Sequence, residues 1–591
     1  MKGTGEIAHT LHVAREFRED LVPHRSRLAL VGGLSLLVTL LDLLKPWPLR
    51  WIVDGALAPG GAASAHPTRT IVLGALAAVA IVSLRAGLGY VREIELAQVG
   101  HRFTRALRHR IFAHLSKLSP RFHARHKSGD LLVRLTGDVP MVSTMMVDSA
   151  IELATRGVLV LGTVAVMFAV DPLLTTAILA TLPVVLLVVR WISGKIRIAV
   201  RKQRRKAGDL ADYLHEAIAA SETIQSLGSS DHVVRRFARN NRRTERAGLK
   251  AKRLTVRMGA TVESLLGVAM AGVLLLGSLR VQSGDLQLGE LLVFLSYVRS
   301  VLKPLRSFSK HADRIAKGTA CGERIQTILH EQPEIASEPG APPAPAHPRA
   351  LEFRHVSFAY ERGSRALVRF DATFRRGELA ALVGRSGAGK STAVALAARL
   401  FDPDEGRVLL DGEPLPSFDL DSLRSRVGLC LQRTVLFGES IRENLLLARP
   451  DASEAELHAS LAEAGASEFI AELTDGIDTE LGSLGAGLSG GQVARIALAR
   501  TLLRGAPILL VDEPFAGLDR EAAGHVADTL RRLARERIVV VIAHDLERLD
   551  EYDRIVFLDA GRKVAEGRHE HLLDVEPLYR RVVRTTAGAS L

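Results

Sequence analysis

Six strongly apolar segments occupy the first half of the chain, and they restrict its possible folds more than any other feature. Each is about as long as the roughly 20 helical residues that cross the hydrocarbon core of a bilayer. The pattern therefore predicts six transmembrane helices. The segments are residues 28–53, 71–91, 151–170, 173–192, 262–281 and 288–305.

The connections between these segments predict how the chain is oriented in the membrane. Three are short turns, whereas residues 92–150 and 193–261 form two long, Arg-rich excursions. The loop over residues 54–68 contains no Lys or Arg, while residues 197–206 are dense in both. Because positively charged loops stay in the cytoplasm, we expect the N-terminus and everything after residue 305 to be cytoplasmic, in a protein of the cell membrane. Residues 7–27 lack the apolar core of a signal peptide and are interpreted as an interfacial helix.

Charge and cysteine content narrow the range of partners. The net charge is +13, and the basic cluster at residues 197–206 could bind nucleic acid or anionic lipid. We interpret it as a solvated helix face that anchors the chain beside the lipid bilayer, and we expect no nucleic-acid partner. Cys321 and Cys430 are the only cysteines, so a disulfide framework or a cysteine metal site is excluded and both are expected to be free thiols.

The composition changes near residue 330. Residues 1–330 form the predicted transmembrane domain, and residues 331–350 are rich in Pro, Glu and Ala, which is typical of a linker. Residues 351–591 alternate short β-rich runs with helical stretches, which predicts an α/β domain with a largely parallel sheet. The clearest predicted strands are residues 408–410, 508–511, 538–542 and 555–558.

A glycine-rich loop carries the strongest functional signal in the second domain. Residues 384–391 read Gly-Arg-Ser-Gly-Ala-Gly-Lys-Ser, which fits the phosphate-loop pattern between a predicted strand and a predicted helix. Backbone N–H groups of such a loop point at phosphate oxygens, with Lys390 reaching the β- and γ-phosphates and Ser391 a magnesium ion. The predicted phosphate-binding residues are Gly384, Arg385, Ser386, Gly387, Ala388, Gly389, Lys390, Ser391 and Thr392.

Two acidic residues end a later apolar strand. Residues 508–511 are followed by Asp512 and Glu513, an arrangement that presents carboxylates at the carboxyl edge of a sheet. We predict that Asp512 binds the magnesium ion and that Glu513 acts as general base on the attacking water. Acids often follow strands, but the position of this pair after a phosphate loop favours the catalytic interpretation.

A third motif, Leu-Ser-Gly-Gly-Gln at residues 488–492, opens the predicted helix 493–503 as a second anion-binding helix start. With this motif the chain resembles an ATP-binding cassette transporter of the exporter type, in which six transmembrane helices precede one nucleotide-binding domain. The resemblance covers essentially the whole chain. It implies a signature at Ser489, Gly490, Gly491 and Gln492, an adenine-stacking Tyr360, a magnesium-contacting Gln432, a dimer-interface acid Asp519 and a catalytic switch His544.

The chain departs from the family pattern before the signature. Residues 482–485 read Gly-Ser-Leu-Gly where exporters usually have Gly-Glu-Arg-Gly, so Ser483 and Leu484 replace two charges. Residues 122–139 and 210–228 resemble the cytoplasmic excursions that contact the ATPase domains. The departure leaves open how the second excursion contacts a partner's ATPase domain.

The resemblance implies alternating access driven by ATP and Mg²⁺. The leading hypothesis is an exporter of a small hydrophobic or amphipathic molecule, a lipid or a peptide; the alternatives are an importer, for example of a metal chelate, and a regulatory ATP sensor. The intact hydrolytic set argues against the sensor. A homodimer is expected because no motif is degenerate, with a heterodimer as the alternative. Asp42 and Arg85 are candidates for the substrate path; the alternative is that they extend toward the membrane interface or form an internal ion pair, in either case without substrate contact.

Overall fold

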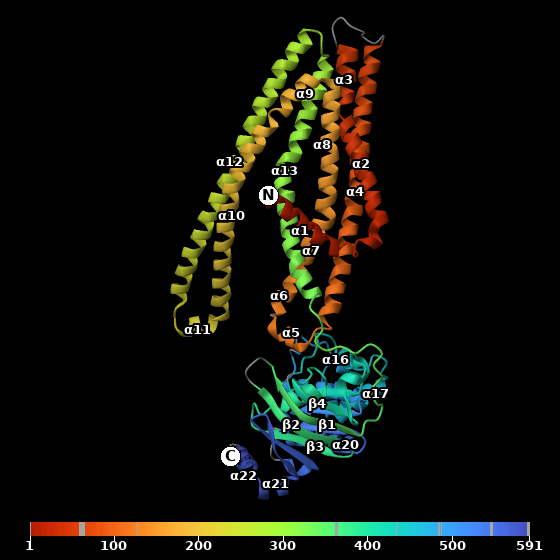
Figure 1. The fold of residues 1–591 in the computed structure, drawn as a ribbon, viewed down its shortest axis with the longest axis vertical. Coiled ribbons are helices and arrows are strands. Elements are labelled where there is room, and N and C mark those ends of the chain that lie inside the picture. Colours follow the sequence, from red (N-terminus) through yellow and green to blue (C-terminus); the bar gives the residue numbers. More distant parts are fainter. Residues whose placement is uncertain are drawn as a thin grey trace. The chain divides into compact units, whose positions relative to one another are not determined.

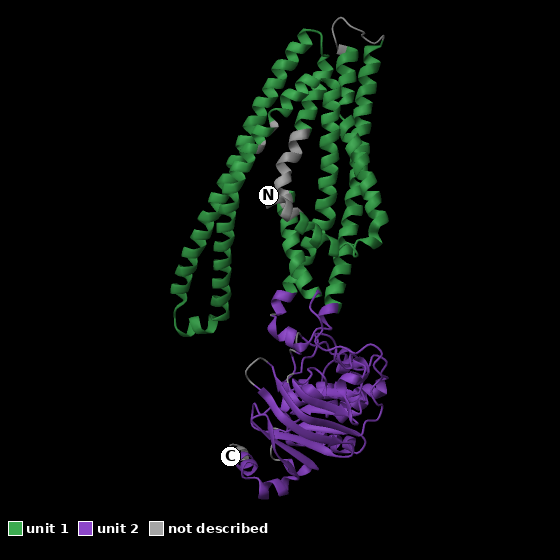
Figure 2. Cartoon of the chain, in the orientation of Figure 1, with its two compact units in different colours: residues 1–113, 132–329 green, residues 114–131, 330–591 purple. Residues whose placement is uncertain are grey.

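The computed structural model describes residues 2–57, 66–126, 128–360, 365–432, 434–482, 485, 487–543 and 548–587 of the 591-residue chain. The chain forms two compact units (Figure 2). The first consists of residues 1–113 and 132–329, and the second of residues 114–131 and 330–591. The chain therefore enters the second unit twice, the first time through part of the excursion between the second and third apolar segments.

The first unit is helical (Figure 1). Three π-helical turns, at Val53–Leu57, Arg134–Asp138 and Thr144–Ser149, interrupt or extend its helices. The helices that lie wholly or mainly in this unit are α1 (Lys2–Glu16), α2 (Arg25–Leu44), α3 (Trp47–Ile52), α4 (Pro67–Leu115), α7 (Val139–Ser143), α8 (Ala150–Val170), α9 (Pro172–Leu179), α10 (Leu182–Ala219), α11 (Ser221–Ser226), α12 (Ser230–Gln282) and α13 (Leu288–Leu329). The short helix α6 (Ser128–Val133) crosses the boundary between residues 131 and 132 and lies mainly in the second unit.

Among the residues that the structure describes, five helical stretches are long and apolar enough to cross a membrane, and they contain the first five predicted segments. The sixth predicted segment lies in α13, where Glu290, Arg299 and Lys303 interrupt the apolar run, and α13 is not among the five. The predicted fold class, a helical membrane domain followed by an ATPase domain, is confirmed. The five stretches are Val22–Ala56, Pro67–Leu115, Ser128–Val170, Pro172–Ala219 and Ser230–Gln282.

Prolines and a buried cap divide the apolar segments more finely than the sequence predicted. The first segment is divided where Pro46 separates α2 from α3. The fourth begins with Pro172 at the first turn of α9, where a missing N–H costs nothing. Asp171 caps that helix by accepting a hydrogen bond of 2.9 Å from the Leu174 N–H, and its other oxygen lies 2.8 Å from Arg280 at the end of α12. One buried carboxylate thus fixes both a helix start and a helix–helix contact.

The second excursion is a hairpin of two long helices. α10 and α12 run antiparallel and are joined at the tip by the short helix α11 (Figure 1). Ser193 Oγ lies 3.8 Å from Met258 Sδ, and Thr244 Oγ1 donates a hydrogen bond of 3.1 Å to the Lys206 carbonyl. These contacts fix which residues of the two helices lie level with each other.

The second unit contains two sheets (Figure 1). The four-stranded antiparallel sheet, which the sequence did not predict, has the order β2-β1-β4-β5, with β1 (Ala350–Ala359), β2 (Arg365–Arg375), β4 (Glu405–Leu410) and β5 (Glu413–Pro414). The six-stranded sheet has the order β10-β9-β3-β8-β7-β6, with β3 (Leu379–Gly384), β6 (Val427–Cys430), β7 (Ile508–Asp512), β8 (Ile538–Ile542), β9 (Arg554–Asp559) and β10 (Arg562–Gly567). Its strands are parallel except β10, which is antiparallel to β9.

The central strands are buried on both faces, which explains their nearly unbroken apolar sequences. Leu379, Ala381 and Val383 of β3 belong to one apolar core, while Ala380 and Leu382 belong to the other. The helices of this unit are α5 (Pro120–Arg125), α14 (Lys390–Ala397), α15 (Leu420–Ser425), α16 (Ile441–Leu446), α17 (Glu454–Glu463), α18 (Ser467–Ala471), α19 (Gly490–Leu503), α20 (Arg520–Ala534), α21 (His569–Val575) and α22 (Pro577–Ala587).

The predicted linker, residues 331–350, contains no helix and reaches a strand only at its last residue. It is nevertheless fixed to the second unit by hydrogen bonds. Ser337 Oγ accepts from the Leu420 N–H at 2.7 Å and donates to Asp419 at 3.1 Å, and the Ala336 carbonyl accepts from Arg399 at 3.1 Å. The segment therefore packs along the second unit.

Candidate functional site

The phosphate loop connects β3 to α14, as the sequence predicted. Gly389 immediately precedes α14 with a φ of +100°, and a Cβ there would lie 2.4 Å from the Ala366 carbonyl oxygen. Only glycine fits both the left-handed backbone and this close approach. Arg385, Ser386 and Gly387 are exposed, whereas Ala388 and Thr392 are buried. The loop thus presents its backbone at the carboxyl edge of the sheet.

Lys390 is folded back over this loop. Its Nζ donates hydrogen bonds of 2.7 Å to the Gly384 carbonyl and 3.1 Å to the Arg385 carbonyl, and the residue is 7% exposed. Burial lowers the pKa of Lys390 from its usual value, while the nearby carboxylates of Asp512 and Glu513 act in the opposite direction. A buried cation that only carbonyl groups hold by hydrogen bonds is well suited to an anionic ligand.

Ser391 and Asp512 are brought together from different parts of the sequence. Ser391 Oγ donates a hydrogen bond of 2.9 Å to Asp512 Oδ2, and Asp512 is buried at the end of β7. β8 lies between β3 and β7. Because parallel strands end at the same edge, a hydroxyl and a carboxylate 121 residues apart meet there. Both are hard oxygen ligands of the kind that Mg²⁺ prefers.

Glu513 takes an unusual backbone conformation next to this pair. Its φ is +52°, and its N–H donates to the Ile542 carbonyl of β8 at 3.1 Å. A non-glycine residue in the left-handed region is strained, and such strain is concentrated at functional sites. Gln432, which follows β6, donates a hydrogen bond of 2.7 Å from Nε2 to Glu513 Oε2. The structure therefore unites the predicted base with the predicted magnesium-contacting glutamine.

Tyr360 lies just beyond the end of β1. Its ring makes edge-to-face contacts with Phe358 at 5.0 Å and Phe401 at 5.4 Å between centroids, and its hydroxyl lies 3.2 Å from Thr392 Oγ1. The residue remains 43% exposed. An oriented, partly exposed aromatic ring beside the helix that follows the phosphate loop can stack on a planar ligand.

The signature residues form a second group. Ser489 and Gln492 cap α19 reciprocally, with hydrogen bonds of 3.3 Å and 2.8 Å, and Asp519 caps α20 by accepting from the Ala522 N–H at 2.8 Å. Gly491 packs so closely against Gly517 that a Cβ would lie 2.3 Å from the Gly517 carbonyl oxygen. Within the described ranges, no hydrogen bond joins the side chains of Ser489, Gln492 or Asp519 to the phosphate-loop group.

Three residues that the sequence singled out lie outside the described residues: His544, Ser483 and Leu484. The strand that leads to His544 is described. β8 ends at Ile542, and the Ala543 N–H donates to the Leu382 carbonyl of β3 at 3.2 Å.

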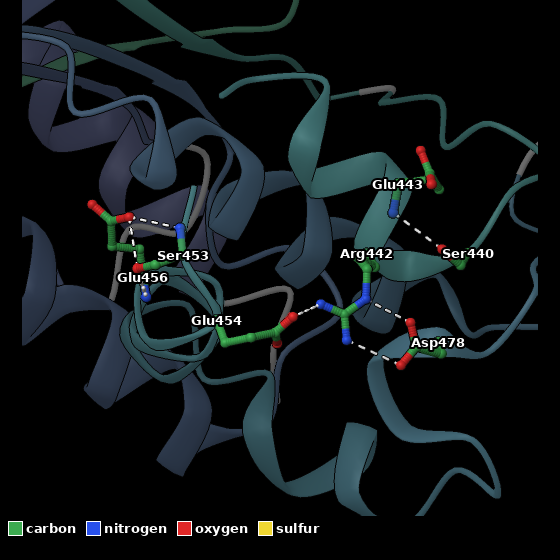
Figure 3. A network of polar contacts seen from close by, with 7 residues as sticks. All are labelled: Ser440, Arg442, Glu443, Ser453, Glu454, Glu456 and Asp478. Carbon is green, nitrogen blue, oxygen red and sulfur yellow. Dashed lines mark hydrogen bonds and ion pairs between the residues drawn. The ribbon is translucent and has the colours of Figure 1, made fainter. Parts of the chain in front are cut away.

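Sequence reasoning missed an ion-pair network that holds α16 in place (Figure 3). Arg442 donates two hydrogen bonds to Asp478, of 2.6 Å and 3.0 Å, and a further one to Glu454. Ser440 caps α16, and Ser453 forms a capping box with Glu456 on α17. The network connects the segment after Gln432 to the segment before the signature. The two Ser-x-x-Glu patterns were the available sequence signal.

The predicted contact of the first excursion with the ATPase domain is made by the short helix α5, which belongs to the second unit, through Arg121, a residue that the sequence did not single out. Arg121 donates a hydrogen bond of 3.3 Å to the Ala359 carbonyl, and its guanidinium carbon lies 5.7 Å from the centre of the Phe358 ring. Ser119 caps the helix, followed by Pro120, which is a readable start signal. The first excursion therefore contacts the strand that precedes Tyr360, through a residue just before the range that resembled the family.

Asp42 and Arg85 form an ion pair between α2 and α4. Arg85 Nε lies 2.7 Å from Asp42 Oδ1, and Nη2 lies 3.3 Å from Oδ2. The side chains are 27% and 45% exposed, respectively. The ion pair that the sequence offered as one interpretation is present, and the placement of these residues on the substrate path stays a prediction.

A helical membrane unit and a phosphate-loop unit on one chain define a membrane ATPase that moves a substrate. Residues 28–305 match the ABC transporter transmembrane region, and residues 367–516 match the ABC transporter family. The chain therefore belongs to the ABC transporters. It binds nucleotide, couples ATP hydrolysis to export, and works as a dimer in a membrane.

Similar proteins agree in architecture. The chain is 32% identical over 541 residues to an ATP-dependent lipid A-core flippase of Chromobacterium violaceum, covering 91% of this chain and 90% of that protein. It is 28% identical over 570 residues to the putative multidrug export ATP-binding/permease protein YgaD of Bacillus subtilis, covering 96% and 98%. A solved bacterial Atm1-family ABC exporter with ATP bound has a TM-score of 0.82 and 29% identity, covering 95% of this chain and 98% of that one.

The contact between Gly491 and Gly517 predicts a stability difference between neighbouring glycines. Gly491→Ala places a Cβ 2.3 Å from a carbonyl oxygen, so we expect a loss of about 1–3 kcal/mol of unfolding free energy from overpacking. Gly490→Ala is the matched control, because nothing lies within 4 Å of its Cβ and alanine is the better helix former. Thermal unfolding of both variants in detergent checks this. Equal stabilities would contradict the close packing.

Proposed function

We propose that the chain is a homodimeric exporter of amphipathic lipids or similar hydrophobic molecules in the cell membrane, with the N-terminus and the ATPase domain in the cytoplasm. One observation carries the catalytic part of the proposal: Ser391 with Asp512, and Gln432 with Glu513, lie in hydrogen-bonded pairs at one edge of the sheet. The lipid A-core flippase and multidrug export names of the relatives support the substrate class.

Glu513 is proposed as the general base. Glu513 directly follows Asp512 in a strained backbone conformation, with a φ of +52°, and its N–H bonds to the Ile542 carbonyl of β8. In this structure the carboxylate accepts a hydrogen bond from Gln432, which orients it. A carboxylate fixed in this way can take the proton of an attacking water. His544 is proposed to contact the γ-phosphate.

Lys390, the phosphate-loop backbone and Tyr360 are proposed to hold ATP. The Lys390 ammonium would exchange its carbonyl contacts for β- and γ-phosphate oxygens, which relieves the cost of its burial. Tyr360 would stack on adenine. Ser489 to Gln492 and Asp519 would serve the nucleotide of the partner copy, because they form a separate, internally capped group.

The oxygen ligands at the sheet edge fit Mg²⁺. Ser391 supplies a hydroxyl, Asp512 a carboxylate and Gln432 an amide oxygen, whereas the described residues contain no group of three His, Cys, Asp or Glu that could hold a metal alone. A site of this kind is completed by nucleotide phosphates. When bound, Mg²⁺ neutralises charge that develops on the transferred phosphoryl group.

The assignment of Glu513 and Lys390 predicts two different defects. Glu513→Gln should retain ATP binding and lower the hydrolysis rate by about a hundredfold or more, because a positioned base is lost while the amide keeps the shape. Lys390→Ala should weaken ATP binding itself. Nucleotide binding and phosphate release are measured on the same reconstituted samples. Near-normal turnover of Glu513→Gln would refute its role.

The homodimer follows from the complete set of motifs on one chain. Each ATP requires the phosphate loop of one copy and the signature of another, and two identical copies supply two such pairs. A closed two-fold assembly is the commonest oligomer. We expect the protein expressed alone to have the mass of a dimer in detergent and to hydrolyse ATP. A monomer, or an inactive dimer that only a second gene product activates, would contradict the prediction and favour the heterodimer.

The substrate class and direction are tested together. In inside-out vesicles, ATP should drive accumulation of a fluorescent amphipathic lipid, and the same lipid should stimulate hydrolysis by the wild type but not by Glu513→Gln. Loss of a preloaded substrate from these vesicles would indicate the importer. Hydrolysis without movement of any amphipathic lipid or peptide offered would favour a regulatory ATP sensor.

A further inference from the structure

We propose that a basic collar on the α10–α12 hairpin, defined as residues 195–206 and 246–257, binds the phosphate headgroups of anionic lipids in the leaflet from which the hairpin emerges. The proposal concerns membrane lipids that surround the protein. It does not depend on the transport substrate.

Charge is divided sharply along the hairpin. The collar contains twelve Lys or Arg residues and no Asp or Glu, whereas residues 207–245, which form the tip, contain five Arg and six Asp or Glu. The whole chain has a net charge of +13. Most of the excess positive charge therefore resides in the collar, while the tip of the same hairpin is nearly neutral.

The two halves of the collar lie level with each other. Ser193 is beside Met258, a Cβ on Gly248 would lie 3.2 Å from Gln203 Nε2, and Thr244 bonds to the Lys206 carbonyl. In this antiparallel register, residues 195–202 of α10 lie opposite residues 249–256 of α12. Positive charges from two helices thus share one band, about 18 Å tall for twelve residues at 1.5 Å each.

The band begins where the apolar part of the hairpin ends. Trp191 is exposed, and the Lys195 ammonium lies 3.7 Å from the centre of its ring. Tryptophan is enriched at membrane interfaces, and long basic side chains there extend toward the headgroups. Trp191 therefore marks the headgroup level from which the collar begins.

The collar is not neutralised within the described part of the chain. In the single chain, all of its cations except Lys206 are exposed. Only two make an ion pair there: Arg204 with Asp313 at 4.0 Å and Lys206 with Asp209 at 3.5 Å. Exposed, acid-free cations at the headgroup level match a surface of phosphates, and each contributes about 1 kcal/mol near an anionic membrane.

Lipid selectivity in vesicles tests the proposal. The full-length protein is reconstituted in phosphatidylcholine with a trace of spin-labelled phosphatidylglycerol or spin-labelled phosphatidylcholine, and electron paramagnetic resonance measures the lipid immobilised by protein. We expect a preference for phosphatidylglycerol of about fivefold or more, the factor that one basic residue supplies. The preference should fall in 1 M salt, where the Debye length is about 3 Å. Equal association of the two lipids would refute the proposal.

Two sets of substitutions locate the effect. Arg197→Gln, Arg201→Gln, Arg253→Gln and Arg257→Gln should reduce the preference severalfold, whereas Arg235→Gln, Arg239→Gln, Arg242→Gln and Arg243→Gln remove the same charge from the tip and should leave it unchanged. Loss of the phosphatidylglycerol preference in both the collar variant and the tip variant would contradict a site confined to the collar.

Arg197→Lys, Arg201→Lys, Arg253→Lys and Arg257→Lys together should keep the preference for phosphatidylglycerol, because phosphate contacts need charge. Loss of the preference in this lysine variant would refute the charge argument. If the glutamine variant does not fold, the lipid preferences of the wild type and of the lysine variant still test the proposal. Displacement of the labelled lipid by soluble glycerol phosphate would show that free phosphate is recognised instead of a lipid surface, and would also overturn the proposal.

Discussion

Burial of the parallel strands on both faces is the constraint on which the catalytic unit depends. β3, β7 and β8 carry alternate residues into two separate apolar cores, so no polar side chain can leave these strands except at their ends. Functional groups are therefore confined to one edge, where the strands finish together. Because of this confinement, the phosphate loop meets Asp512 and Glu513 there, although Ser391 and Asp512 are 121 residues apart in the chain.

The proposed ligand-binding groups of this unit fall into two sets, which differ in their hydrogen-bond partners. Lys390 and Glu513 bond to carbonyl and amide groups that a ligand can replace. Ser489, Gln492 and Asp519, by contrast, satisfy the first N–H groups of their own helices, so these helix starts are already rigid. A rigid group that approaches a ligand from another copy loses little conformational entropy on binding. This division suits the proposed dimer, in which each ATP contacts the phosphate loop of one copy and the signature of the other.

The sequence predicted the features that local patterns encode. The phosphate loop, the strand before Asp512 and the signature helix are contiguous motifs, and the structure has them as expected. The antiparallel sheet escaped prediction because β1 pairs through bulged registers with both β2 and β4, and Leu351 of β1 lies opposite Leu410 of β4, far along the chain. The pairing of Asp42 with Arg85 depends on how α2 and α4 are rotated, which residue types do not specify. The collar was visible only in part, because its two halves become one surface only through the register of α10 and α12.

Arg442 joins the segment that follows Gln432 to the segment that precedes the signature. Its guanidinium bonds in two places to Asp478, whose hydrogen bonding raises the pKa of Arg442. Backbone bonds from Ile441 to Thr479 and from Leu481 to Glu439 join the same two segments. One segment follows Gln432, which contacts Glu513, and the other leads toward the signature. An exposed ion pair contributes little alone, but a bidentate pair beside two backbone bonds resists sliding of one segment past the other. The segment at residues 439–442 is therefore held firmly against the segment at residues 478–481.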